Sequence, residues 1–167
     1  MRHSHSFTWY RHQIYRFRNV YHSQPLPPQQ YSCEHIIPKS FFRQRHHAND
    51  PMNLAPCDLK TNIRRSNFAL GNIENMMEGG RPIYDTLDQY TGHLHTTQRI
   101  FYPSLECDRG LISRSILFMI EKYPYLYDDL PLILSPPDTE EILDGWRLYP
   151  STTDFEDHRN FWVGIIK

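Results

Sequence analysis

Alternation of polar and apolar residues in the first third of the chain predicts a strand, a loop, a second strand and a helix. Residues 31–37 alternate loosely and are rich in residues that favour β structure, so we expect a short strand there. Residues 52–55 predict a second short strand, which Pro56 is expected to stop. A helix is expected over residues 58–68, with Asp58 as its N-cap.

The second half of the chain has the pattern of a helical core. Residues 111–123 predict a central helix, because apolar side chains recur there at helical spacing. The apolar positions are Ile112, Ile116, Met119, Ile120 and Tyr123. Two capping-box sequences, at residues 138–141 and 153–156, predict further helices after a proline-broken loop at residues 124–137. Residues 71–110 are rich in turn-forming residues and are expected to be irregular.

These elements predict an α+β fold in a single domain. We expect the domain over residues 29–167, with the strand–loop–strand–helix unit at about residues 31–68. Residues 1–28 are expected to form a basic arm that ends in a proline-rich connector.

The net charge of −1 conceals an uneven distribution. Residues 1–67 carry ten Lys and Arg against three acids, a net of +7, whereas the remaining residues carry eight against sixteen, a net of −8. A basic half indicates a polyanionic partner, and nucleic acid is the first candidate. A solvated surface with uneven charge is the alternative.

Hydropathy and cysteine content indicate in which cellular compartments the protein is expected. No run approaches the roughly 20 apolar residues that cross a membrane, and no apolar signal region follows the N-terminal Arg and His residues. We therefore expect no membrane association and, by default, a cytoplasmic or nuclear protein. The first 33 residues contain no acid, which leaves an organelle or viral setting open. Cys33, Cys57 and Cys107 cannot all pair within one chain, so free thiols are expected.

Polar residues of the first unit have the composition that phosphodiester hydrolysis requires. His35 is the candidate general base, because histidine side chains, with an ordinary pKa of about 6.5, accept protons from water near neutral pH. Glu34 and Asn62 are the candidate metal ligands, since Mg²⁺ prefers oxygen ligands. Adjacent residues of a strand point to opposite faces, so Glu34 and His35 serve one site only if the strand ends or bends there.

Other residues nearby suit supporting roles. Asn53 is expected to bond to backbone groups and pin the loop that carries His35. Arg65 is expected either to clamp a phosphate or to bridge the helix to the rest of the fold. Further arginines are expected to contact nucleic-acid phosphates without specifying sequence. They are Arg43, Arg45 and Arg64.

Three motifs follow one another in this segment. They are Glu-His-x-x-Pro-x-Ser-(aromatic)-Phe at residues 34–42, Asp-x-x-Asn-Leu-x-Pro at residues 50–56 and Asn-x-x-Arg-x-Asn at residues 62–67. In this order they resemble the motifs of the bacterial endonuclease I family, within the His-Me finger superfamily. Residues 109–119 also resemble the central helix of that family, and residues 146–160 its C-terminal region.

The resemblance implies a ββα-metal (His-Me finger) core packed with several helices. It implies an Mg²⁺-dependent endonuclease, with Mn²⁺ or Ca²⁺ as substitutes, in which His35 acts as base and Glu34 and Asn62 hold the metal. The expected substrate is DNA, with RNA left open, cut with little sequence specificity to give 5′-phosphate ends. A monomer is expected, with Asn53 and Asn67 as structural supports of the site.

Three alternatives stay open. The family usually has His where this chain has Met52, which leaves a non-cutting nucleic-acid-binding or structural protein on the same scaffold as the second hypothesis. Cys33, Cys57 and His46 or His47 could bind zinc together with His35, although no Cys-x-x-Cys pair is present. Cys33 and Cys57 could instead pair in an oxidising compartment.

Overall fold

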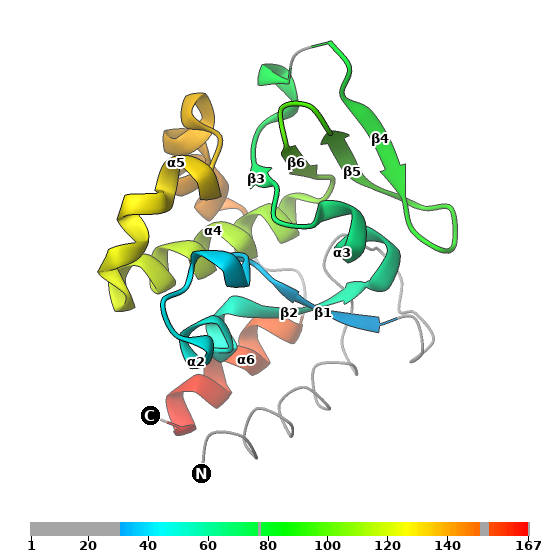
Figure 1. The fold of residues 1–167 in the computed structure, drawn as a ribbon. Helices are drawn as coiled ribbons and strands as arrows, with labels where there is room; N and C mark the ends of the chain where they lie inside the picture. Colours follow the sequence, from blue (N-terminus) through cyan, green and yellow to red (C-terminus); the bar gives the residue numbers. More distant parts are fainter. Residues whose placement is uncertain (1–30, 77, 151–153, 167) are drawn as a thin grey trace.

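A strand hairpin, a helix, a four-stranded sheet and a group of helices make up the computed structural model of this protein (Figure 1). The structure describes residues 31–76, 78–150 and 154–166. The predicted α+β fold with a ββα unit is confirmed. The predicted N-terminal arm at residues 1–28 lies outside the described residues.

The first unit consists of β1 (Tyr31–His35), β2 (Leu54–Asp58) and α3 (Leu59–Arg65). The strands pair antiparallel, with Glu34 opposite Ala55 and Cys33 opposite Pro56. The prediction that Pro56 ends the second strand is therefore wrong. A two-stranded sheet has only edge strands, so a proline can occupy a position whose N–H is not needed for pairing.

Helix α3 begins where the sequence predicted a cap. The Asp58 carboxylate accepts hydrogen bonds from the Thr61 N–H at 2.8 Å and from the Thr61 hydroxyl at 3.1 Å, which confirms the predicted N-cap. The helix ends at Arg65, three residues before the predicted end at residue 68, because Ser66 has a positive φ of 50°.

Short helical turns connect β1 to β2. They are η2 (Lys39–Phe41), α2 (Arg45–Ala48) and η3 (Pro51–Asn53). Asp50 fixes the last turn, because its carboxylate accepts the Met52 N–H at 3.0 Å and contacts the Lys122 ammonium at 2.7 Å. This loop is therefore anchored to the central helix of the domain.

The region predicted to be irregular, residues 71–110, instead contains most of a second sheet. Its order is β3 (Ala69–Leu70), β6 (Ile100–Pro103), β5 (Tyr90–His95) and β4 (Arg81–Tyr84). A 3₁₀ turn, η4 (Ile73–Asn75), lies between β3 and β4. The strands are short and interrupted by turns and a register shift at Ile83/Tyr84, so no long alternating pattern marks them in the sequence.

The central helix is α4 (Glu106–Lys122), which begins five residues before the predicted helix at residues 111–123. Its predicted face is confirmed: Ile112, Ile116, Met119 and Ile120 are buried and Tyr123, just beyond the end, is half-buried. The first turn of α4 was not predicted because its residues are polar and do not extend the apolar pattern, although one of them, Asp108, is buried.

Short helices complete the domain. They are η5 (Pro124–Asp129), α5 (Leu130–Ile133), η6 (Pro136–Asp138), the π-helical turn η7 (Glu141–Gly145), η8 (Trp146–Leu148) and α6 (Asp154–Ile166). The predicted loop at residues 124–137 is thus mostly helical. The helix predicted after residue 138 is present to residue 148, as consecutive 3₁₀, α, π and 3₁₀ turns. Within the described residues, no helix has the length and apolar character needed to cross a membrane.

Candidate active site

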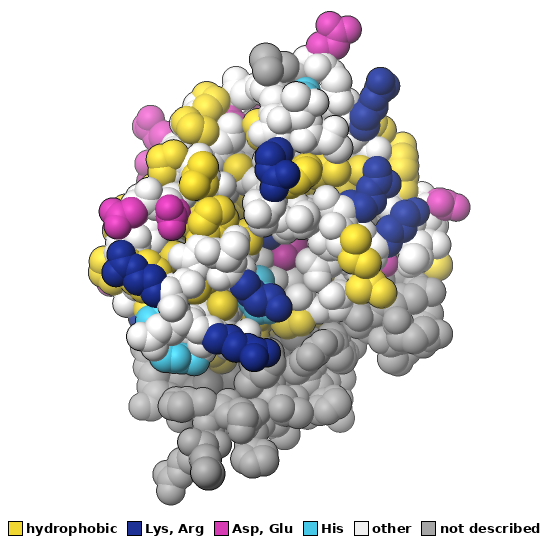
Figure 2. Space-filling model, viewed as in Figure 1, with side chains coloured by type: hydrophobic (Ala, Val, Ile, Leu, Met, Phe, Trp, Pro, Cys, Tyr) yellow, Lys and Arg dark blue, Asp and Glu magenta, His cyan; other side chains and the backbone are white. Residues whose placement is uncertain are grey.

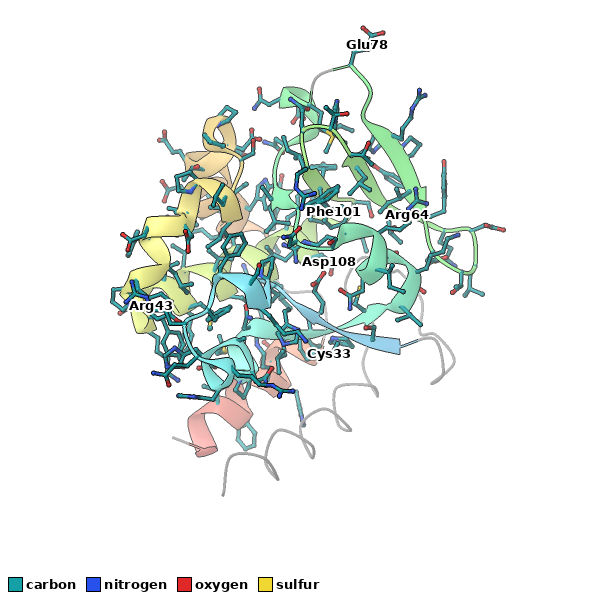
Figure 3. The ribbon with its side chains drawn as sticks, in the orientation of Figure 1. Cys33, Arg43, Arg64, Glu78, Phe101 and Asp108 are labelled. Atoms are coloured by element: carbon teal, nitrogen blue, oxygen red, sulfur yellow. The ribbon has the colours of Figure 1, made fainter. Side chains whose placement is uncertain are left out.

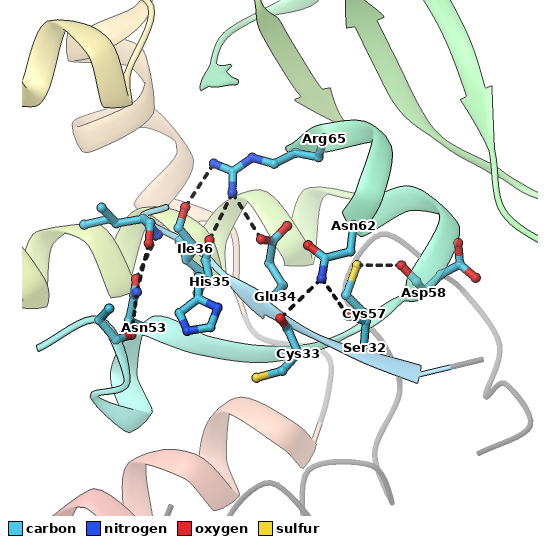
Figure 4. Close-up of polar contacts among 12 residues, drawn as sticks. Ser32, Cys33, Glu34, His35, Ile36, Asn53, Cys57, Asp58, Asn62 and Arg65 are labelled. Atoms are coloured by element: carbon cyan, nitrogen blue, oxygen red, sulfur yellow. Dashed lines mark hydrogen bonds and ion pairs between the residues drawn. The ribbon is translucent and has the colours of Figure 1, made fainter. Parts of the chain in front are cut away.

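Glu34 and His35 are the last residues of β1 and project to different sides of the hairpin (Figure 4). The Glu34 side chain points towards α3 and is 2% exposed, whereas His35 is half-buried and points away from α3. Strand alternation produces this separation. A shared reaction site must therefore lie around the end of β1, where the strand stops.

Arg65 of α3 holds the end of β1. Its guanidinium lies 3.1 Å from the Glu34 carboxylate and donates to the carbonyl oxygens of His35 and Ile36, each at 3.0 Å (Figure 4). Arg65 has no exposed surface. Of the two roles expected for Arg65, this geometry supports the bridge between helix and strand, because a fully buried guanidinium cannot reach a substrate phosphate.

Asn62 lies one helical turn before Arg65 and faces the same strand. Its amide nitrogen donates to the Ser32 hydroxyl at 2.7 Å and to the Cys33 carbonyl at 3.3 Å. These bonds fix the amide plane and turn the amide oxygen towards the Glu34 carboxylate (Figure 4). The helix therefore brings an amide oxygen and a carboxylate together, as the sequence suggested for Glu34 and Asn62.

Asn49 orients His35. The His35 Nε2 atom lies 3.0 Å from the Asn49 side-chain oxygen. An amide oxygen only accepts, so Nε2 carries the hydrogen in this pair and Nδ1 is the basic nitrogen of the neutral ring. Asn49 was not among the predicted site residues, because fourteen positions separate it from His35 and only the fold of the loop between β1 and β2 brings the two together.

Asn53 connects three segments of the site loop. Its side-chain oxygen accepts the Ile37 N–H at 2.8 Å, and its nitrogen donates to the carbonyls of Ile37 and Ala48 at 3.0 Å each. Asn53 is fully buried. The residues that follow His35 are thus fixed to the segment that precedes β2.

The other predicted residues lie on the surface or away from the site. Arg43, Arg45 and Arg64 are exposed, and Figure 3 shows Arg43 and Arg64 on opposite sides of the ββα unit. Asn67 is exposed and accepts a hydrogen bond from Arg99, so it joins α3 to the turn between β5 and β6 and contacts no site residue in that bond. On the face shown in Figure 2, Lys and Arg side chains surround an area where histidine and acidic atoms are visible.

The cysteines do not form the alternative zinc or disulfide site. Cys33 lies opposite Pro56 and Cys57 opposite Ser32, so the two thiols point to different faces of the hairpin. Burial raises the pKa of the Cys57 thiol well above its ordinary value, which opposes the thiolate that a metal would need. Among the described residues, no three His, Cys, Asp or Glu side chains gather as a metal site, and the cysteines are not bridged.

Glu34 and Asn62 fit a hard divalent cation by their chemistry. A carboxylate and an amide oxygen are ligands that Mg²⁺ accepts, and Mg²⁺ usually keeps several waters, so two protein ligands suffice. The Glu34 charge is shared with Arg65 at 3.1 Å, so a cation there would compete with an ion pair already present.

An antiparallel hairpin followed at once by a helix, with Glu-His at the end of the first strand and Asn on the helix, defines a ββα-metal nuclease fold. The family model for Endonuclease I matches residues 10–131. The chain belongs to the endonuclease I family, as its motifs suggested.

Membership in this family makes the protein a hydrolase that acts on nucleic acid. A comparison with curated proteins gave no match.

Proposed function

We propose that the protein is a divalent-metal-dependent endonuclease that hydrolyses phosphodiester bonds of DNA, and of RNA as a further substrate, with little sequence specificity. The observation that carries the proposal is the arrangement of Glu34, His35 and Asn62 around one strand end, held there by the buried Arg65. Two separate elements, β1 and α3, bring Glu34 and Asn62 together, and His35 lies at the same strand end on the other side of the hairpin.

His35 is the general base of the proposed reaction. Its Nδ1 takes a proton from a water molecule as the water oxygen forms a bond to phosphorus. The bond from phosphorus to the 3′ oxygen breaks, and the products are a 5′-phosphate and a 3′-hydroxyl, which takes its proton from solvent. The hydrogen bond from Nε2 to Asn49 supports this assignment, because it fixes the tautomer and the direction of the ring.

Glu34 and Asn62 would hold the cation, with water completing its coordination. Bound there, the cation supplies positive charge beside the phosphate and stabilises the charge that develops on the departing oxygen. Arg65 would keep the Glu34 carboxylate in position and Asn53 the loop beyond His35. Neither of the two side chains has to touch the substrate.

Exposed arginines would bind the nucleic acid through its phosphates. Arg43, Arg45 and Arg64 are candidates, because they are exposed and belong to the basic part of the chain. Phosphate contacts carry no sequence information, which supports low specificity. Arg65 is no longer a candidate for such a contact, since it is fully buried.

The proposal is tested with purified protein, supercoiled plasmid and Mg²⁺, with and without EDTA. We expect nicking that EDTA abolishes and that His35→Ala lowers by roughly 10²–10⁴-fold with folding unchanged, the usual contribution of a general base. Mutation of the exposed His46 to Ala is the matched control and should leave cutting unchanged. Absence of nicking with Mg²⁺, Mn²⁺ and Ca²⁺ alike would refute the proposal and favour the non-cutting scaffold.

A further inference from the structure

Aromatic side chains form a row on one face of the four-stranded sheet. In the strand register, Tyr84 lies opposite Tyr90, and His93 lies between Pro82 and Tyr102. Residues that face one another across strands project to the same side of a sheet. The opposite side carries the core residues Ile83, Leu94 and Phe101.

The rings of the row are in contact with one another. Ring centroids are 6.3 Å apart for Tyr84 and Tyr90 and 5.4 Å apart for Tyr90 and His93, and the Tyr90 hydroxyl bonds to the His93 Nδ1 atom. The row continues to Tyr102, which lies directly opposite His93 in the strand register. Tyr84 is 43% and Tyr90 41% exposed, so their rings can be reached from solvent.

At Tyr102 the row enters a cavity of about 410 Å³. The Tyr102 ring lies 6.5 Å from that of Trp146, and the Arg109 guanidinium lies over Tyr102 at 4.9 Å and over Tyr149 at 5.3 Å. Apart from Pro137, the remaining lining groups are amides and carboxylates, which match the donor and acceptor edges of a base rather than a phosphate. They belong to Asn72, Glu74, Asn75, Asp138 and Glu141.

The other end of the row lies beside the N-terminus of α3, the helix that carries Asn62. The Thr86 hydroxyl, in the turn between β4 and β5, donates to Asp58, the N-cap of α3, at 3.1 Å. Lys60 and Arg64 are exposed on that helix, where Figure 3 labels Arg64. Positive charge is thus available for phosphates at this end, with Asp88 as the exposed acid of the turn.

We infer that this face of the sheet binds the unpaired bases of a single-stranded nucleic acid, which stack on Tyr84 and Tyr90 and place one base in the cavity at Tyr102. The inference rests on the proposed function, since it describes how the nuclease holds its substrate. Stacking on exposed rings tolerates any base, because every base has an aromatic face, and so it agrees with low specificity. The positive charges of Lys60 and Arg64 favour a polyanion. The exposed rings of Tyr84 and Tyr90 favour unpaired bases, because the bases of a closed duplex are already stacked on one another.

Binding is measured by fluorescence anisotropy in EDTA, which prevents cutting, with a labelled strand of about 15 nucleotides, the size of one typical site. We expect tighter binding of the strand than of the same sequence as a duplex. Tyr84→Leu and Tyr90→Leu should each weaken single-strand binding by roughly 5- to 150-fold, the factor that corresponds to the loss of one stacked base. Tyr84→Phe and Tyr90→Phe keep the ring and should bind like the unmodified protein.

Two further measurements complete the test. Tyr127→Leu removes a tyrosine of η5 that is 55% exposed, more than Tyr84 or Tyr90, and should not change affinity. Photo-cross-linking with 5-iododeoxyuridine should label Tyr84, Tyr90 or Tyr102. Normal single-strand affinity in both leucine variants, with plasmid nicking intact, would overturn the inference and leave the proposed function standing. A protein that binds neither strand nor duplex would overturn both.

Discussion

Replacing Asn53 by Ala should destabilise the protein more than any surface change near the site. The side chain is fully buried and satisfies three backbone groups: the Ile37 N–H, the Ile37 carbonyl and the Ala48 carbonyl. Ile37 has no exposed surface and Ala48 is 2% exposed, so water reaches these groups only through the space that the mutation opens. Each buried polar group left without a partner costs about 1–3 kcal/mol.

The expected loss is smaller than the sum of those three penalties. Removal of the carboxamide leaves room for about one water molecule, which can satisfy two or more of the stranded groups. We therefore expect unfolding free energy to fall by about 2–4 kcal/mol, a large share of the stability of an ordinary domain. For a domain of this length, the melting temperature should fall by roughly 5–15 °C.

Urea denaturation and thermal melting measure this effect, with Asn67→Ala as control, because Asn67 is an exposed amide. Asn53→Asp refines the test: an ionised carboxylate still accepts from the Ile37 N–H but cannot donate to the two carbonyls. We expect it to be at least as destabilised as the alanine variant at neutral pH. A loss below about 0.5 kcal/mol in Asn53→Ala, the range typical of surface changes, would refute the view that this amide holds the loop.

Three more predictions follow from the site. Asn62→Ala should raise the Mg²⁺ concentration needed for half-maximal nicking while DNA affinity in EDTA stays the same; an unchanged metal titration would exclude Asn62 as a ligand. If three arginines contact phosphates, a plot of log DNA affinity against log salt concentration should have a slope of roughly −3. Arg64→Ala should make that slope shallower by about one. Affinity that does not change with salt would contradict the proposal that arginines bind the phosphates. Asp58→Ala should lower the free energy of unfolding, measured in urea, by about 1–2 kcal/mol, because it removes the N-cap of α3 and its hydrogen bonds to Thr61 and Thr86. If Lys60→Ala lowers the free energy of unfolding by as much, the cap contributes little to stability.

The sequence predicted the ββα unit well because its determinants are local. Asp58 caps the helix three residues before the N–H that it accepts, and the Glu-His pair sits where a strand ends. The sheet of β3 to β6 escaped prediction because its strands are short and the pairing of β4 with β5 shifts register at Ile83/Tyr84. In the sequence, Gly92 suggests a turn, but in the structure it lies within β5. A Cβ atom there would lie 2.1 Å from the Tyr102 carbonyl oxygen, so the glycine allows the two strands to approach closely.

Site residues that act through distant contacts were the hardest to predict. Asn49 bonds to His35 across fourteen positions, and no spacing rule connects the two. Lys122 and Tyr123 reach Asp50 from the end of α4, seventy-two and seventy-three positions away. Such contacts depend on how α4 packs against the loop, which periodicity in one segment cannot specify.

The ion pair between Glu34 and Arg65 links the stability of the fold to its proposed chemistry. Both side chains are buried, and the same guanidinium also bonds to the carbonyls of His35 and Ile36. Breaking a buried pair by removing one partner typically costs about 3–5 kcal/mol, because the other charge stays buried without compensation. Lost activity in Glu34→Ala would therefore be ambiguous between loss of a metal ligand and loss of structure.

Glu34→Gln separates the two effects, since glutamine keeps an acceptor for Arg65 but lacks the charge that attracts a cation. If Glu34 holds the metal, this variant should need more Mg²⁺ than a destabilised control of equal melting temperature, such as Asn53→Ala. Equal metal requirements in the two variants would assign Glu34 to the fold alone. The end of β1 would then depend on Asn62 and water for its cation, a weaker site than the one proposed.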